Sequence, residues 1–290
     1  MAGPILVYGF IDSAILVLMA LGFNLTFGIS GVANFAYGAI YVVAGFFAWS
    51  LINTLHLPFL FSALVAIAAI GFAGVVLYRL ILVRIRGLVI SEVIATFAVS
   101  LVLLELLRYF GFIGSKYTLP VLVNGSIEVL GTYVDIQRLL IVAFGVVVLS
   151  GLYLFTHHTR MGLAFRGIAQ EEHTALSLGL NPDRIAGWSM GFGAALAALA
   201  AIVILPLGTV TVDGGYDVLI TALSVCIVGG LGSTFGVVIA SLIIGFAQQL
   251  TATYLSSHWT MIVSLVALLV VLVIKPSGLL GHQKELEERV

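Results

Sequence analysis

Charged side chains are scarce in this 290-residue sequence, and their scarcity excludes most soluble architectures. Asp, Glu, Lys and Arg together make up 9% of the residues, whereas soluble domains carry about 25%. The net charge of -1 gives no electrostatic basis for binding nucleic acid. Cysteine is also scarce, because Cys226 is the only one and has no partner for a disulfide or a metal site. We therefore expect no redox chemistry, no metal and no cofactor.

Apolar residues are what the chain has in abundance. They make up 61% of the sequence, and the mean hydropathy is +1.22. A hydrocarbon core about 30 Å thick takes about 20 apolar residues per helix, so the chain has room for roughly eight to ten spans. The N-terminus, "MAGPILVYGF", lacks the basic region and cleavage site of a signal peptide, so we expect it to remain as a first span. The sequence predicts an all-α membrane protein in which residues 1–290 form a single transmembrane domain.

Nine apolar segments are candidates for crossing the bilayer. They cover residues 5–28, 36–54, 58–80, 88–112, 137–156, 186–206, 215–230, 233–254 and 258–275. The segment at 215–230 is short and ends in glycine, so it could also enter the membrane and turn back. We expect a polytopic bundle of about eight or nine transmembrane helices, with glycine-interrupted helices in both halves.

Positive charge predicts how these helices are oriented. Arginine and lysine gather in three regions, which hold Arg79, Arg84 and Arg86, then Arg160, Arg166 and Arg184, and finally Lys275, Lys284 and Arg289 in the tail. By the positive-inside rule, all three regions should be cytoplasmic. Two segments join the first region to the second, and four join the second to the tail if 215–230 crosses the membrane. An even number of crossings returns the chain to the same side, which agrees with this orientation. We therefore expect a cytoplasmic C-terminus and an N-terminus outside.

Glycine-rich interruptions separate apolar segments in both halves of the chain. They read "GISGVANFAYG" at residues 28–38 and "VGGLGSTFG" at residues 228–236. A broken helix frees backbone polar groups, which inside a membrane must face protein or a water-filled cavity. Breaks in corresponding halves of a transporter indicate the transport path. We therefore predict a substrate pathway lined by Asn34, Tyr37, Gly31, Gly38, Gly229, Gly230 and Gly232.

The alternative interpretation of these residues is structural. Small residues let helices approach closely in lipid, and the sequence has rows of them, such as Gly187, Gly191 and Ala195, and Gly193, Ala197 and Ala201. In that case the glycines of the interruptions pack against neighbouring helices, and Asn34 bonds only the neighbouring backbone.

Three charged residues fall inside the segment at 88–112, where they are functional candidates because buried charge is costly. Glu92 is near the cytoplasmic end, where its carboxylate can reach water. Glu105 and Arg108 are three residues apart and can pair on one helix face. A competing hypothesis is a carrier driven by an ion gradient, with Glu92 or Glu105 as its ion site. The sequence has no Walker A motif or catalytic constellation, so we expect no enzyme activity.

The polar segment at 157–185 is longer than a turn between helices requires. Ile168, Ala175, Leu176 and Leu180 give a short helix an apolar side, and Gly179, Asn181 and Pro182 end it. A left-handed backbone is expected at Gly179, after the last turn. Because the polar side is acidic rather than basic, docking to a protein partner is favoured over binding to lipid.

Four stretches together resemble the inner-membrane permease subunits of ATP-binding cassette importers for branched-chain amino acids. They read "GFNLTFGISGVANFAYGAIYVVAGFFA", "TRMGLAFRGIAQEEHTALSLGLNPDRI", "GGYDVLITALSVCIVGGLGSTFGVVIASLIIG" and "IKPSGLLG". The resemblance extends from about Leu21 to Gly281. Tyr37 stands where the family commonly has histidine, and Phe235 stands where it often has proline.

The resemblance also implies a coupling role for the segment at 157–185. Permeases of this class carry a Glu-Ala-Ala-x-x-x-Gly motif, of which only Ala175 and Gly179 match here. The residues expected to couple to an ATPase are Arg166, Glu171, Glu172, His173, Ala175 and Gly179.

A membrane-bound assembly is implied in turn by the resemblance. It would join this chain to a second permease, homologous or identical, to two cytoplasmic ATPase subunits and to an extracytoplasmic solute-binding protein. Transport would proceed by alternating access across a bacterial or archaeal inner membrane. The implied substrates are branched-chain or similar small amino acids, and relatives that carry urea or another small polar solute are the alternative.

Overall fold

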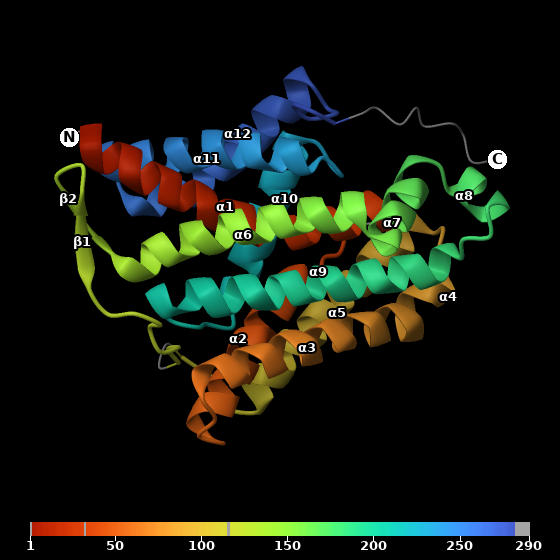
Figure 1. Cartoon of the computed structure of the whole chain (residues 1–290), viewed down its shortest axis with the longest axis horizontal. Helices are drawn as coiled ribbons and strands as arrows, with labels where there is room; N and C mark the ends of the chain where they lie inside the picture. The colour runs from red at the N-terminus through yellow and green to blue at the C-terminus, as the bar shows by residue number, and fades with distance from the viewer. Residues whose placement is uncertain (1, 32, 115–116, 282–290) are drawn as a thin grey trace.

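The computed structural model describes residues 2–31, 33–114 and 117–281, and these residues are mostly helical (Figure 1). In this part of the chain, seven helices are long and apolar enough to span a bilayer, and two shorter apolar helices accompany them. The main helices are α1 (Ala2–Ser30), α2 (Tyr37–Asn53), α3 (Phe59–Leu77), α5 (Val89–Tyr109), α6 (Ile136–His158), α9 (Pro182–Ile204), α10 (Gly214–Gly229), α11 (Thr234–Tyr254) and α12 (Thr260–Ile274). Each of the nine predicted segments is therefore a helix.

Short elements complete the chain. A π-helical turn, Tyr78–Leu82, and α4 (Val83–Ile85) extend α3, while 3-10 turns at Leu205–Leu207 and Ser257–Trp259 precede α10 and α12. Between α6 and α9 lie α7 (Arg160–Gln170) and α8 (Glu172–Ser177), where the sequence had suggested one short helix. The segment at 157–185 and a β-hairpin lie at opposite ends of the long axis (Figure 1).

The hairpin was not among the predicted elements. Strands β1 (Ser126–Val129) and β2 (Thr132–Asp135) are antiparallel, with Val129 opposite Thr132. Leu130 and Gly131 form the turn with φ angles of 52° and 75°. Two successive residues with positive φ are what a two-residue hairpin turn requires.

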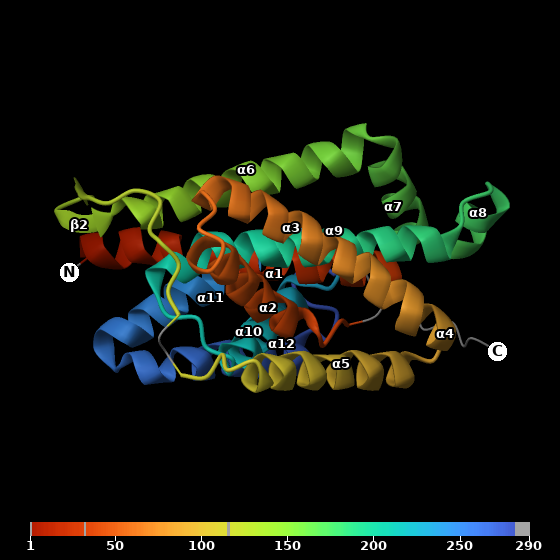
Figure 2. The same ribbon diagram turned by 90° about the horizontal axis from the view of Figure 1, so that it is seen from below.

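The helices form two halves with the same order of elements. In each half a long helix, α1 or α9, is followed by an irregular connection, a short helix and two further helices. The packing agrees, because α1 packs on α11 as α9 packs on α3, and α1 packs on α10 as α9 packs on α2. Helix α1 starts at the hairpin end and α9 starts at the α8 end (Figure 2). The two halves are therefore inverted with respect to each other, an arrangement found in many transporters.

Small residues lie where the paired helices cross. A Cβ atom on Gly191 of α9 would come 3.0 Å from the carbonyl oxygen of Gly71 in α3. Similarly, a Cβ atom on Gly245 of α11 would come 2.7 Å from the backbone nitrogen of Ser13 in α1. Close contacts of this kind hold helices together where no hydrophobic effect does so. The packing role predicted for the row that contains Gly191 is therefore confirmed.

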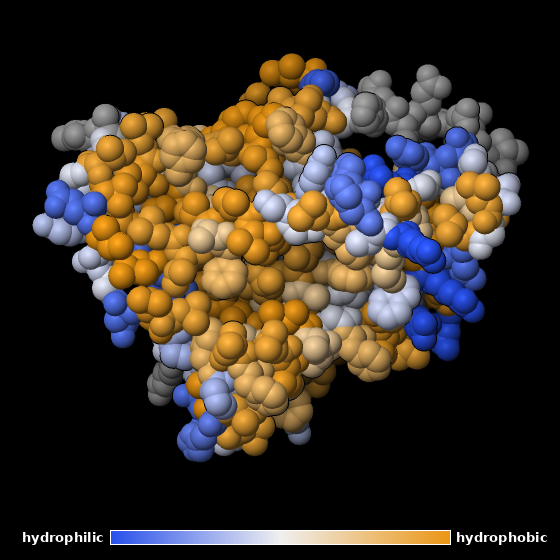
Figure 3. Space-filling model, viewed as in Figure 1, coloured by the Kyte–Doolittle hydropathy of each residue, from blue (hydrophilic) through white to orange (hydrophobic). Residues whose placement is uncertain are grey.

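Apolar side chains also cover the outside of the bundle. Figure 3 shows a broad hydrophobic surface over the middle of the molecule and hydrophilic residues toward its two ends. Exposed residues of α6 and α12 contribute to the apolar surface, among them Val146, Val147, Leu269 and Val273. Such a surface suits the hydrocarbon core of a bilayer, and the chain is a multi-pass membrane protein.

Candidate functional site

A narrow polar cleft lies toward the end of the bundle where α7 and α8 are found. We name it the Asn34 cleft. Its lining includes Thr26, Asn34, Arg86, Glu92, Thr96 and Met190. These residues come from α1, the connection after it, the end of α4, α5 and α9. The free volume is about 20 Å³, which has room for about one water molecule. The cleft is therefore closed to any larger solute in this conformation.

Asn34 lies in the connection between α1 and α2, where only 5% of its surface is exposed. Its Oδ1 atom accepts a hydrogen bond from the backbone nitrogen of Ala36 at 3.0 Å, and its Nδ2 atom lies 3.4 Å from the sulfur of Met190. Gly31 has a φ angle of 71°, so the chain can leave α1 sharply. Asn34 thus bonds the neighbouring backbone and also lines a cleft, which are features of both sequence interpretations.

Glu92 is buried more deeply than the sequence had suggested, with 5% of its surface exposed. Its Oε1 atom accepts a hydrogen bond from the backbone nitrogen of Gly87 at 2.7 Å, so the carboxylate holds the turn that starts α5. The hydroxyl of Thr96 accepts a bond from the backbone nitrogen of Phe35 at 3.2 Å. These bonds join α5 to the connection that carries Asn34.

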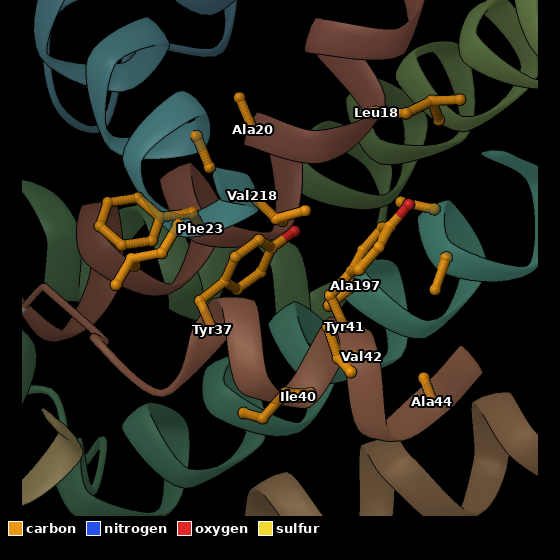
Figure 4. Close-up of a cluster of buried hydrophobic side chains, with 14 of the residues drawn as sticks. Leu18, Ala20, Phe23, Tyr37, Ile40, Tyr41, Val42, Ala44, Ala197 and Val218 are labelled. Carbon is orange, nitrogen blue, oxygen red and sulfur yellow. The ribbon is translucent and has the colours of Figure 1, made fainter. Parts of the chain in front are cut away.

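Tyr37, which was predicted to lie beside Asn34 on the pathway, is fully buried in the core. Figure 4 shows its ring beside Phe23 and Val218, and the Phe23 ring meets it edge-on at 5.7 Å. Tyr37 is not among the residues that line the Asn34 cleft. Tyr41, one turn later in α2, lines a different cavity, described below.

Four of the predicted glycines make close backbone contacts. A Cβ atom on Gly38 would overlap the carbonyl oxygen of Gly215, and one on Gly229 would come 2.5 Å from the carbonyl carbon of Gly236. The backbones of Gly230 and Gly232 pack in the same way against Gly281 and Gly28, respectively. The interruption at 228–236 therefore packs against the end of α1 and lies near the first one. A pathway role for these glycines stays a prediction.

The sequence analysis paired the interruption at 28–38 with the one at 228–236. In the inverted repeat, however, the connection between α1 and α2, which carries Asn34, corresponds to the segment at 205–213 between α9 and α10. This segment lines a second cavity, which we name the Arg138 cavity and which has a volume of about 320 Å³. Ile15, Met19, Tyr41, Val42, Arg138, Leu205, Thr209 and Val218 are among its lining residues. The sequence analysis missed it, although Pro206, Gly208, Gly214 and Gly215 mark an irregular stretch there.

Bonds from neighbouring segments hold the 205–213 connection in place. The backbone nitrogen of Val210 donates to the carbonyl oxygen of Tyr117 at 2.8 Å. Gln137, which is 1% exposed, donates from Nε2 to the carbonyl oxygen of Val203 at 3.1 Å. Because Gln137 fixes the first turn of α6 against the end of α9, the next residue, Arg138, is held at the edge of the cavity.

The predicted coupling segment ends as expected at Gly179, whose φ angle is 82°. The Gly179 nitrogen donates to the Leu176 carbonyl at 2.9 Å, and the Leu180 nitrogen donates to the Ala175 carbonyl at 3.1 Å. These two bonds form a Schellman motif, for which a left-handed residue is needed. The left-handed backbone predicted at Gly179 is confirmed.

The side chains of the coupling segment divide into two sides. Phe165, Ile168 and Ala175 are buried in one cluster with Ile29 of α1 and Ile185 of α9. Glu171 is exposed and Arg166 is partly buried. Leu176, which was expected on the apolar side, is 47% exposed, and Leu178 is 78% exposed. Glu172 and His173 were also predicted to couple to an ATPase, and their side chains lie outside the described part of the structure.

In the described part of the chain, three ion pairs involve residues of the predicted charged segments, and two of them connect different elements. Arg108 bonds Glu105, which confirms the predicted pair, and it also bonds Asp213 at 2.5 Å. The second contact joins α5 to the segment before α10. Arg86, after α4, bonds Asp183 in the first turn of α9.

Comparison with known protein families agrees with this architecture. The family described as "Branched-chain amino acid transport system / permease component" matches residues 5–272. The chain belongs to this family. The resemblance found in the four sequence stretches is therefore confirmed.

Individual relatives align over almost the whole chain. The high-affinity branched-chain amino acid transport system permease protein LivH of Salmonella typhimurium is 29% identical, and the match covers 91% of each chain. The permease protein BraD of Pseudomonas aeruginosa is 27% identical over 96% of this chain and 95% of BraD. LivM of Salmonella typhimurium is 24% identical over 92% of this chain and 68% of LivM.

A solved structure shares the fold. It is described as PsaBC from Streptococcus pneumoniae in complex with Fab, and its TM-score with this chain is 0.52. The match covers 94% of this chain and 92% of the other at 13% sequence identity.

Proposed function

We propose that this chain is a membrane-spanning permease subunit of an ATP-driven importer for branched-chain or similar small amino acids. The observation that carries the proposal is the pair of inverted connections, each of which lines its own cavity, in a chain of this family. Irregular backbone inside a membrane is tolerated where it lines such a cavity. One cavity is open and the other is nearly closed, as alternating access requires of the two ends of a pathway.

The α8 end is proposed to face the cytoplasm. Arg79, Arg84, Arg86, Arg160, Arg166 and Arg184 belong to the elements at this end. Figure 3 shows hydrophilic residues gathered around α7 and α8. The positive-inside rule then gives a cytoplasmic C-terminus and puts the hairpin and the Arg138 cavity outside.

Coupling is proposed to pass from α8 to the Asn34 cleft through α1. The buried cluster of α7 and α8 packs on Ile29, in the last turn of α1, directly before the connection that carries Asn34. An ATPase subunit could bind an amphipathic surface here, formed by exposed Leu176 and Leu178 and the acidic Glu171. Because packed helices move as rigid bodies, a displacement of α8 would move the end of α1 and change the cleft.

The partners follow from this role. Two ATPase subunits would bind the α8 end, and a solute-binding protein would deliver substrate at the hairpin end. A second permease would complete the membrane part, either another copy or a paralogue, since LivH and LivM of one organism both resemble this chain.

Reconstitution tests the proposal directly. Proteoliposomes that contain the chain with its partner permease and ATPases should take up L-leucine when ATP and the loaded binding protein are supplied. Uptake driven by an ion gradient without ATP, or uptake of urea in preference to leucine, would contradict the proposal.

A further inference from the structure

The lining of the Arg138 cavity has the chemistry of an amino-acid site. We propose that the cavity binds the substrate amino acid within this one chain, with Arg138 bound to the carboxylate and Asp12 to the ammonium group. The branched side chain then lies against the apolar wall. This inference rests on the proposed function and adds to it a site and residue roles.

The Arg138 cavity is large enough for an amino acid, whereas the Asn34 cleft is not. About 320 Å³ falls within the range of 300 to 1,000 Å³ that is typical of small-molecule pockets. The Asn34 cleft, with about 20 Å³, has no room for an amino acid in this conformation. A substrate that arrives at the hairpin end therefore reaches the Arg138 cavity while the opposite end is closed.

The wall of the cavity is mostly apolar. Ile15 and Met19 of α1, Val42 of α2, Leu205 after α9, and Val218 of α10 all contribute to it. A branched aliphatic side chain that enters such a pocket leaves water, and each buried CH₂ group contributes about 0.8 kcal/mol. Urea offers no apolar group to this wall, so the lining favours an aliphatic amino acid.

Arg138 is the charged residue among the described residues that line the cavity, and an acidic residue of α1 lies on the stripe that leads from the cavity toward the hairpin. Tyr8, Asp12, Ile15 and Met19 recur at spacings of four, three and four residues, so they form one stripe along α1. Two of them line the cavity, and Asp12 is next along the stripe toward the hairpin. The guanidinium of Arg138 lies 5.3 Å from the centre of the Tyr8 ring, one helical turn from Asp12 on the same stripe. Arg138 lines the apolar pocket, and Asp12 lies beyond it on the same stripe as the lining residues Ile15 and Met19. A positive group in the pocket and a negative group next to it match the two charges of a zwitterion.

The ion pair of Arg138 with Asp135 is loose, and the contact with the Tyr8 ring uses the face of the guanidinium and not its hydrogen-bond donors. The Nε atom of Arg138 is 3.8 Å from Oδ2 of Asp135, which is longer than a hydrogen bond. The guanidinium has five donors in a planar fork, a geometry that suits a carboxylate. A substrate carboxylate therefore offers Arg138 a better partner than the contacts it already has.

Protection from a thiol reagent tests occupancy of the cavity. Thr209 lines the cavity and is exposed, so Thr209→Cys in a Cys226→Ala background should react with a small water-soluble methanethiosulfonate. L-Leucine should slow this reaction several-fold in the purified permease pair, whereas leucinamide, which lacks the carboxylate, should not. Arg138→Gln should abolish the protection, and Arg138→Lys should retain part of it. Ser126→Cys in the hairpin is exposed outside the cavity, so leucine should leave its rate unchanged.

A second variant fills the space. Gly208 lines the cavity, has an extended backbone and has nothing within 4 Å of its Cβ position, so a side chain can start there without backbone strain. We expect the large ring of Gly208→Trp to obstruct the cavity. Leucine uptake by the complete transporter should fall about tenfold or more, an effect equal to the loss of at least 1.4 kcal/mol of binding. Gly151→Trp on α6, which also has open space at its Cβ position, should stay within about twofold.

The outcomes separate this inference from the proposed function. If the unmodified transporter imports leucine but Thr209→Cys is unreactive, or reacts at the same rate with and without leucine, the inference is wrong and the function stands. Unchanged uptake by Gly208→Trp would overturn it too. If the unmodified transporter imports no amino acid, the proposed function itself fails.

Discussion

The Asn34 cleft and the Arg138 cavity occupy equivalent positions in the inverted repeat but differ in size and in lining. The first has about 20 Å³ of free volume and a polar lining, whereas the second has about 320 Å³ and a mostly apolar one. In the cleft, Asn34 bonds within the connecting segment, and Thr96 of α5 bonds that segment from outside. In the cavity, the equivalent segment is also bonded from outside, by the carbonyl oxygen of Tyr117. The two connections are therefore both anchored to a neighbouring element, and the spaces differ in volume and lining.

The comparison indicates which contacts must break when the Asn34 cleft opens. A hydrogen bond in a protein contributes about 1 kcal/mol net, so the few bonds across the Asn34 cleft are a small barrier to opening it. Helix α2 begins beside the cleft and passes the cavity at Tyr41 and Val42. It crosses α10 at Gly38 and Gly215, at a point of its sequence between Asn34 of the cleft and Tyr41 of the cavity.

The largest effect is expected at the crossing of α2 and α10. Gly38→Val should destabilise the protein by about 3 kcal/mol or more, because its Cβ atom meets the backbone oxygen of Gly215, which cannot move aside. The apparent melting temperature in detergent should fall by about 10 °C. Gly151→Val makes the same change on an open helix surface and should have little effect. An unaltered melting temperature for Gly38→Val would show that the two helices do not cross at this point.

The α8 surface should carry the next largest effect. Glu171→Lys combined with Glu172→Lys reverses two charges in the proposed ATPase contact, and like charges in an interface cost several kcal/mol. Association with the ATPase subunits and ATP-driven uptake should fall more than tenfold, while insertion and folding are retained. Normal co-purification and uptake would count against the assignment of the surface.

A smaller effect is expected at the end of α8. Gly179 has a φ of 82°, where a β-branched residue is strained by about 1 to 2 kcal/mol. Gly179→Val should therefore lower uptake several-fold more than Ser177→Val, which changes a residue on the same helix. Equal uptake by the two variants would mean that the cap does not contribute to coupling.

The smallest effect is expected for Glu92→Gln in the Asn34 cleft. Glu92→Gln keeps an oxygen to accept the bond from the Gly87 nitrogen, so ATP-driven uptake should stay within about twofold. Glu92→Ala removes that bond and should destabilise the protein by about 1 to 3 kcal/mol. Loss of uptake in Glu92→Gln would instead indicate the titrating carboxylate of a gradient-driven carrier.

Local patterns predicted the parts of this molecule that depend on local sequence. The nine helices follow from apolar runs, and the left-handed residue at Gly179 follows from its place after a short helix. The pair of Glu105 and Arg108 follows from a spacing of three residues. Each of these features involves neighbours in the chain, so the sequence holds the necessary information.

Features that depend on the arrangement of the two halves could not be predicted in this way. The interruption at 228–236 was paired with the one at 28–38 because both are rich in glycine, whereas the inverted repeat pairs the latter with 205–213. Arg138 received no role because the polar loop before it gave no sign that Gln137 would fix α6 to α9. Leu176 was expected on the apolar side of a short helix but is exposed, because a helix of six residues is too short for its sides to be assigned from spacing alone.

The central claim is that the two spaces open in alternation, and paired accessibility measures this most directly. Asn34→Cys and Thr209→Cys, each in a Cys226→Ala background, would be labelled by the same small thiol reagent in the assembled transporter with no nucleotide, with trapped ATP and with ADP. The account predicts that the two labelling rates change in opposite directions between states, with Thr209→Cys fast whenever Asn34→Cys is slow. Rates that rise and fall together, or an Asn34→Cys that is unreactive in every state, would contradict it.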